Sequence, residues 1–362
     1  MKKKLHFATE YRQRRERKLH KRRLRKVSIV LDQGISTAYA KCPEHLTLYK
    51  LRDRSEFLEM LQQLRLTVAD GKRRIRIDFS CLNSIDASAA ILLRAEIERI
   101  KKLYPKLVVR GIYPRNVKCA HVLAKIGVSK LCGMPQKIGN FDDVVHWSVV
   151  TGEDVDGEKY ATELMAPYEG RLLGDLDKRL YVGVSEAMTN VTHHAYIDAR
   201  DDGLADTHED ERQWWMFSQE RKGQLQVVIC DLGIGIPRTL PRSQKPELAP
   251  VVRWMRKESR QDADVLSAVL KKTAGTRPVA QAPEDTFSRT GQVHRGRGLY
   301  NIVHAVRDID KASIAVLSNS GGWIKSTDGD KGGAKVRFND NIKGTIISWS
   351  IPIGPHHEKQ DD

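Results

Sequence analysis

Between residues 40 and 135, short segments with the two-residue period of a β-strand alternate with longer segments that have the period of a helix. The strand-like segments are residues 45–51, 74–79 and 107–109, and the helix-like segments are residues 54–68, 86–103 and 116–126. Strands that alternate with helices are typical of a layered α/β domain. We therefore expect residues 40–135 to form one α/β domain.

A second pattern of helices and strands follows. It begins with apolar residues at helical spacing over residues 168–195, followed by a strand over 225–231 and a polar and basic segment over 237–295. A helix over 298–306 and strands over 313–318 and 344–353 complete it. This order predicts an α/β sandwich in which helices cover one face of a sheet. The expected organisation is a tail (1–30), a first domain (40–135), a junction (136–164), a second domain (165–354) and a C-terminal tail (355–362).

Most of the excess of basic over acidic residues lies in residues 1–26. The 362 residues contain 62 Lys and Arg against 46 Asp and Glu, a formal net charge of +16, and residues 1–26 hold 13 of the basic residues against Glu10 and Glu16, a net of +11. Such a run repels itself and favours a disordered tail. It either binds nucleic acid or another acidic surface, with affinity that falls with salt, or is a solvated arm.

Apolar stretches are far shorter than the ~20 residues of a membrane-spanning helix, and the basic N-terminus is not followed by an apolar signal segment. The five cysteines are far apart and form no Cys-x-x-Cys pair, which argues against a zinc site or a disulfide framework. Cys81 and Cys230 lie in apolar runs and are expected in the core. We expect a cytoplasmic protein without a membrane segment.

Three polar residues stand at helical spacing in the second pattern. Glu186, Asn190 and His194 occur at i, i+4 and i+8, which predicts one face of one helix. Polar groups along an otherwise apolar helix are costly without a ligand or partners. This face is therefore a candidate binding site.

Two glycine-rich motifs follow. Asp231-x-Gly233-x-Gly235-Ile236 directly succeeds the strand over residues 225–231 and combines an acceptor with backbone that can approach a ligand closely. Arg295-Gly296-Arg297-Gly298-Leu299 opens a helix, as phosphate-binding turns do. Each motif alone is weak, but their order is specific.

In this order the three motifs resemble the N, G1 and G2 boxes of the GHKL (Bergerat-fold) ATPases, a group that includes histidine-kinase catalytic domains, anti-sigma-factor serine kinases, gyrase and MutL. The resemblance covers about residues 165–354, and Thr345 resembles the late threonine beside adenine. It implies ATP and Mg²⁺ as ligands. His194, followed by a small residue and Tyr196, is more similar to the anti-sigma-factor kinases.

The resemblance implies a role for each motif residue. Asp231 would accept a hydrogen bond from the adenine amino group, Asn190 would bind Mg²⁺, and Glu186 would be the general base. His194 would either contact phosphate or pack at the helix end. The remaining implied ATP-binding residues are Gly233, Gly235, Ile236, Arg295, Gly296, Arg297, Gly298, Leu299 and Thr345.

Residues 76–89 resemble the core of the STAS (anti-sigma-factor antagonist) domains, in which a strand and a turn lead into an Asp-Ser-Ser-Gly helix start. Ser88 occupies the position of the second serine and is the candidate phosphoacceptor; Ala87 and Ala89 depart from the pattern. Ser88 is alternatively only a residue of the helix N-terminus.

Together these resemblances imply a regulatory protein that binds ATP and Mg²⁺ and either hydrolyses ATP or transfers its γ-phosphate to a serine. The STAS-like domain would contact a protein partner, and whether ATP closes a homodimer is left open. The alternative is a nucleic-acid-associated GHKL ATPase anchored by residues 1–26. A third hypothesis is a binding scaffold with a vestigial ATP site, against which the intact Glu186 and Asn190 argue.

Overall fold

The computed structural model has a mixed α/β fold. It describes residues 37–136, 145–152, 162, 166–168, 170–172, 175–204, 212–221, 223–242, 248–257, 261–275, 298–327 and 333–354. The predicted tails, 1–30 and 355–362, lie entirely outside the described residues. Below, the N-terminal half means residues 37–136 and the C-terminal half means the described residues from 145 onward.

The N-terminal half contains a parallel sheet of order β1-β3-β5, a small parallel pair β2-β4 and four helices. Its strands are β1 (Ala38–Lys41), β2 (His45–Leu46), β3 (Arg74–Asp78), β4 (Ser84–Ile85) and β5 (Val108–Ile112). Its helices are α2 (Leu51–Ala69), α3 (Ala87–Leu103), α4 (Val117–Lys125) and α5 (Val128–Leu131). The three long helices and strands β3 and β5 were predicted, whereas residues 45–51 yield only a two-residue strand before α2 begins.

Local sequence explains where the predicted helices begin. The side chain of Asp86 accepts a hydrogen bond from the backbone N–H of Ala89 (2.8 Å) at the start of α3, and Asn116 caps α4 through Cys119 (3.1 Å). Gly127, at φ 77°, provides the left-handed residue between α4 and α5.

The C-terminal half is built on a seven-stranded sheet of order β11-β10-β9-β12-β8-β7-β6, in which each strand is antiparallel to its neighbours. Its strands are β6 (Val145–Gly152), β7 (Trp214–Arg221), β8 (Gln224–Asp231), β9 (Ser313–Ser318), β10 (Gly321–Ser326), β11 (Ala334–Arg337) and β12 (Thr345–Pro352). Because β6 pairs with β7, part of the expected junction, 136–164, belongs to this sheet.

Helical segments of the C-terminal half are η1 (Ala166–Tyr168), α7 (Leu176–Asn190), η2 (Val191–Ala195), α8 (Ile236–Thr239), η3 (Leu240–Arg242), α9 (Ala249–Lys257), α10 (Asp262–Gly275) and α11 (Gly298–His304). The long helix expected over residues 168–195 is thus shorter, because α7 begins at Leu176 and gives way to the π-helix η2 after Asn190. Among the described helices, none is long and apolar enough to span a bilayer.

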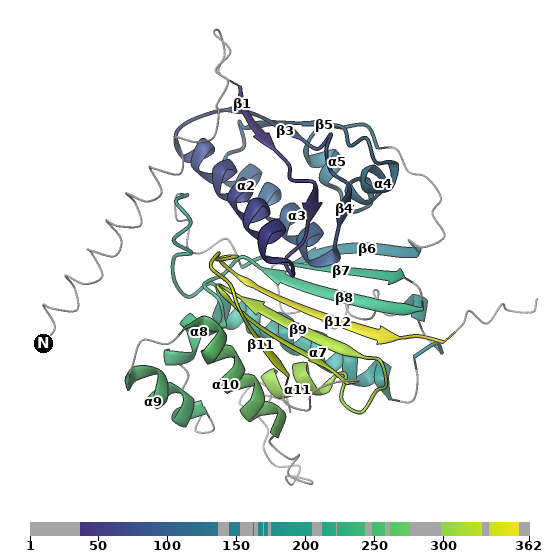
Figure 1. Cartoon of the computed structure of the whole chain (residues 1–362), viewed down its shortest axis with the longest axis vertical. Coiled ribbons are helices and arrows are strands. Elements are labelled where there is room, and N and C mark those ends of the chain that lie inside the picture. The colour runs from purple at the N-terminus through teal and green to yellow at the C-terminus, as the bar shows by residue number, and fades with distance from the viewer. Residues whose placement is uncertain are drawn as a thin grey trace, which may run out of the picture.

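Both faces of the seven-stranded sheet are covered, which corrects the expectation of one covered face. Val227 and Ile229 of β8 pack in a core with α7, α10 and α11, whereas Val228 and Cys230 point to the opposite face and pack in the core of the N-terminal half. Figure 1 shows the resulting layers: the sheet β1-β3-β5, then α2 and α3, then the seven-stranded sheet, and then α7, α10 and α11. Cys230 is buried as expected, but Cys81 is exposed.

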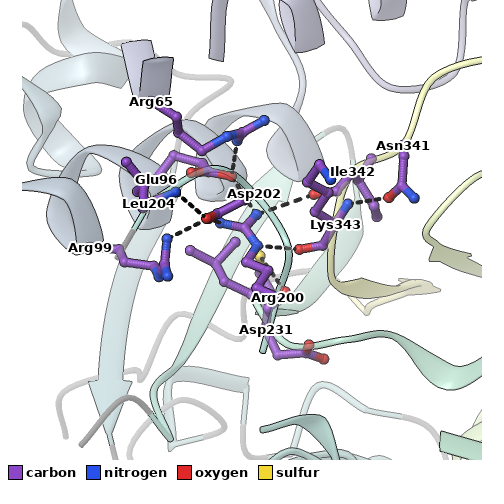
Figure 2. Close-up of polar contacts among 12 residues, drawn as sticks. Arg65, Glu96, Arg99, Arg200, Asp202, Leu204, Asp231, Asn341, Ile342 and Lys343 are labelled. Atoms are coloured by element: carbon purple, nitrogen blue, oxygen red, sulfur yellow. Dashed lines mark hydrogen bonds and ion pairs between the residues drawn. The ribbon is translucent and has the colours of Figure 1, made fainter. Parts of the chain in front are cut away.

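A buried ion network joins the two halves (Figure 2). Glu96 of α3 accepts hydrogen bonds from Arg65 of α2 (2.7 Å) and from Arg200, which lies in the loop after η2. Asp202 of the same loop pairs with Arg99 of α3 and with Arg200. Burial acts to raise the pKa of Glu96, but the guanidinium groups of Arg200 and Arg65 outweigh it and lower the pKa to about 2.

We expect Glu96→Gln to destabilise the protein by about 3–5 kcal/mol, because the isosteric amide leaves three buried arginines with the single carboxylate of Asp202. Urea unfolding at neutral pH measures the loss. The Glu96 contribution is present above pH 4.5 and is lost as the pH falls toward 2, so the difference between wild type and variant shrinks in acid.

The matched control is Glu56→Gln, since Glu56 is half-exposed and pairs with Arg52 on the surface of α2. It should change the free energy of unfolding by less than about 0.5 kcal/mol. Equal effects of the two substitutions would contradict the structural role of the network.

Candidate functional site

The helix α7 positions Glu186 and Asn190 next to each other on the side of the sheet that faces away from the N-terminal half. Its apolar side packs on the sheet through residues such as Leu180, Val184 and Met188, while Glu186 and Asn190 are half-buried. One amide atom of Asn190, Nδ2, is buried without a hydrogen-bond partner. A buried unsatisfied amide is costly, which is typical of a side chain that awaits a ligand.

His194 does not continue the face of Glu186 and Asn190. The backbone widens into the π-helix η2 after Asn190, and His194 lies there with an exposed side chain. A π-helical turn changes the direction in which successive side chains project, and such turns occur often at functional sites.

The end of η2 is packed directly on the glycine-rich turn after β8. Ile234 donates its N–H to the carbonyl of Ala195 (2.8 Å), and a Cβ on Gly233 would lie 2.3 Å from that oxygen. Only glycine therefore fits at position 233. Gly235 has φ 81° and approaches the side-chain amide of Asn319, and Ile236 donates its N–H to Ser318 Oγ (2.9 Å).

Asp231 ends β8 on the same face of the sheet as α7. Its carboxylate accepts a hydrogen bond from Gly233 N–H (2.9 Å) and interacts with the side chain and backbone of Thr345, its register partner on β12. Burial raises the pKa of Asp231 to about 6, although these donors act in the opposite direction. A buried carboxylate with acceptor capacity is suited to bind an N–H donor of a ligand.

The helix α11 packs against α7 beside Glu186. Asn301 Nδ2 donates to Glu186 Oε1 (3.2 Å), and Gly183 lets the two helices approach because a Cβ there would lie 3.1 Å from that of Ala305. Gly298 is the first residue of α11 and Leu299 is half-buried. Arg295, Gly296 and Arg297 lie outside the described residues.

Four residues that the motif analysis did not single out as site residues hold this region together. Tyr196 accepts a hydrogen bond from Leu232 N–H (3.1 Å) and donates to the carbonyl of Gln213. Ser318 and Asn319 bind the turn from β9, and Asn319 Nδ2 donates to Ile234 O (2.9 Å). Asn301 carries no sequence signal, whereas Tyr196 follows His194 by two residues and belongs to the similarity with the anti-sigma-factor kinases.

The buried ion network reaches the site through Arg200. Its Nε donates to the carbonyl of Lys343 (2.6 Å), one residue before Gly344, and its Nη2 donates to Ile342 O (3.3 Å). A Cβ on Gly344 would lie 2.2 Å from the carbonyl oxygen of Asp231. Figure 2 shows Arg200 between Glu96 and the segment that leads to Thr345, with Asp231 nearby. The N-terminal half therefore supports the backbone beside Asp231.

The residues present fit Mg²⁺ only as part of a ligand complex. Within the described part of the chain, no group of three His, Cys, Asp or Glu side chains is arranged to hold a metal. Mg²⁺ commonly takes one or two protein oxygens together with water and substrate phosphates. Asn190 Oδ1 is an oxygen of the kind this mode uses, whereas the unpartnered Nδ2 is a donor and suits an acceptor oxygen of a ligand rather than the cation.

Ser88 lies on the other side of the seven-stranded sheet from this arrangement. It is in the first turn of α3, fully buried, with its Oγ 2.9 Å from Tyr49 Oη. Because α3 packs on the opposite face of the seven-stranded sheet from α7, the sheet separates Ser88 from Glu186 and Asn190.

The structure thus brings Glu186, Asn190, Asp231 and Thr345 to one face of the sheet, with the turn through Gly233, Gly235 and Ile236 and the start of α11 beside them. Comparison of the chain with models of protein families, with curated proteins and with solved structures finds no match in any of the three. The assignment of this face as a candidate nucleotide site rests on its geometry and on the motif order.

Proposed function

We propose that this chain is an ATP- and Mg²⁺-binding regulatory protein whose nucleotide site is the α7 face of the seven-stranded sheet. The observation that carries the proposal is that the buried Asp231 carboxylate and the Asn190 amide, whose Nδ2 has no hydrogen-bond partner, lie on the same face of the sheet, with the glycine turn packed beside Asp231. The motif order of the GHKL ATPases supports the same assignment.

Asp231 would recognise the adenine amino group, because its carboxylate is buried and retains acceptor capacity beyond the N–H of Gly233. Thr345 and Gly233 hold this carboxylate in place. The glycines of the turn let Ala195 and Asn319 pack closely against its backbone, which holds the turn beside Asp231.

Asn190 would contribute an oxygen to Mg²⁺, which neutralises phosphate charge when bound. Glu186 would orient the attacking hydroxyl or water and accept its proton. Its carboxylate is itself oriented by Asn301 on α11 (3.2 Å), so a shift of α11 would also move the base.

The position of Ser88 favours water or a serine of another molecule as the acceptor of the γ-phosphate. Ser88 Oγ is buried against Tyr49 on the face opposite Glu186. Transfer to Ser88 within the same molecule would require the two halves to separate, which breaks the buried ion network.

Asn190→Ala and Asp231→Asn should each weaken ATP–Mg²⁺ binding about tenfold or more, because each removes one polar contact that the ligand would complete. Calorimetry on the full chain measures this affinity. The control Asp177→Asn, on the exposed first turn of α7, should bind like wild type. Wild type that binds no ATP would refute the proposal.

Glu186→Gln should retain ATP binding but reduce the release or transfer of the γ-phosphate about 10²–10⁴-fold, as expected for loss of a general base. Turnover of γ-labelled ATP measures the rate, and the position of the label separates hydrolysis from phosphotransfer. Unchanged turnover would remove Glu186 from the chemical step.

Adenosine affinity should fall as the pH drops below about 6, approaching tenfold per pH unit, because protonation of Asp231 removes the charged acceptor. Adenosine has no phosphate that titrates in this range, so the titration reports on the base site. If the affinity for adenosine did not change between pH 5 and pH 8, Asp231 would not contact the base as a carboxylate.

A further inference from the structure

The three-stranded sheet β1-β3-β5 has one face packed on helices and one face open. Ala38, Ala40, Ile75, Ile77 and Val109 are buried, whereas the residues that alternate with them are exposed or partly exposed. Figure 1 shows these strands at the outer end of the molecule, with α2 and α3 between them and the seven-stranded sheet. Parallel sheets are almost always covered on both faces. An open face on a parallel sheet therefore indicates a surface with a partner.

The open face combines cations with exposed apolar groups. Its exposed residues are Tyr39, Lys41, Arg74, Arg76, Val108, Arg110 and Ile112. Tyr39, Arg76 and Arg110 occupy one row across the three strands. Three of the seven large hydrophobic residues found exposed in the described chain lie here, so this is a patch rather than scattered exposure.

We propose that this face binds single-stranded nucleic acid. The open face carries four cationic side chains and one carboxylate. The carboxylate is that of Asp78, which is half-buried and accepts a hydrogen bond from Ser80 N–H (2.9 Å). Three of the four cations are arginines, whose planar guanidinium groups suit phosphate and base contacts better than lysine does. The charge of the face is thus complementary to a phosphate backbone.

Tyr39 distinguishes nucleic acid from other anionic partners. Its ring is 41% exposed, and the Arg76 guanidinium lies 5.5 Å from the ring centre, with Arg76 Nη1 3.2 Å from Tyr39 Oη. An exposed ring beside arginines is a platform on which unpaired bases stack. Bases in a duplex are already stacked, so the face favours single strands.

The sequence that leads into this sheet adds charge of the same sign. Residues 1–26 carry a net charge of +11, and Ala38, the first residue of the edge strand β1, follows twelve residues after Lys26. The open face and this segment are therefore close along the chain. The face is separated from α7 by α2, α3 and the seven-stranded sheet, so the inference is independent of the proposed nucleotide site.

The test measures binding of a labelled oligo-dT and oligo-rU of about 20 nucleotides to the full chain by fluorescence anisotropy over a series of salt concentrations. Arg74→Glu/Arg76→Glu should weaken binding about tenfold or more and flatten the salt dependence. Tyr39→Ala should weaken binding of single strands more than binding of a duplex of the same length. Circular dichroism and thermal unfolding verify that the variants are folded.

The matched control is Arg52→Glu/Lys130→Glu, which makes the same change in net charge on the exposed surfaces of α2 and α5. It should keep the affinity within about twofold of wild type. Equal losses in both double variants, or full binding by Arg74→Glu/Arg76→Glu together with loss on deletion of residues 1–26, would overturn the proposal. Preference for polyglutamate or for vesicles containing phosphatidylserine over the oligonucleotides would also overturn it.

Discussion

The pairing of Glu96 with Arg200 is the interaction on which the arrangement of this molecule depends. Both side chains are fully buried, and each belongs to a different half of the chain. A buried ion pair contributes less to net stability than to geometry, because wrong alignments leave charges unpaired in a medium of low polarity. Apolar packing of α3 on β7 and β8 tolerates small shifts, whereas the contacts of Arg200 with Glu96, Asp202 and two backbone carbonyls do not. The network thus sets the register between the halves.

The same arginine links that register to the candidate nucleotide site. Arg200 fixes the carbonyl groups of Ile342 and Lys343, and the next two residues contact Asp231. Arg54 of α2 makes a comparable contact with Asn319 O (3.4 Å), and Asn319 in turn binds the glycine-rich turn. The backbone on both sides of the proposed base site is therefore held by side chains from the N-terminal half or from the loop that pairs with it.

Local chemistry explains which features the sequence could predict. Alternation in Arg74–Asp78, the cap at Asp86 and the left-handed Gly127 are decided within a few residues, and β3, α3 and the end of α4 were predicted accordingly. The short strand β1 and the glycine-containing β10 have weak patterns and were missed. The covering of the second sheet face could not be predicted, since Val228 and Cys230 read as an ordinary buried strand whichever element packs on them. For the candidate site, the motifs predict roles for Asp231 and Asn190, and these remain predictions; Asn301 and Arg200 act through contacts distant in sequence, which no motif signals.

The shared core has a consequence for how the chain can be divided. Phe217, Val228 and Leu317 of the large sheet lie in the same apolar cluster as Leu93 and Ile97 of α3. Cutting the chain after residue 136 would expose that cluster on both fragments. It would also leave Arg200 without the Glu96 carboxylate of α3. Fragments divided at the motif boundaries would consequently aggregate. To obtain both fragments in soluble form, they would have to be co-expressed, so that the exposed apolar surfaces of the two pack on each other as they fold.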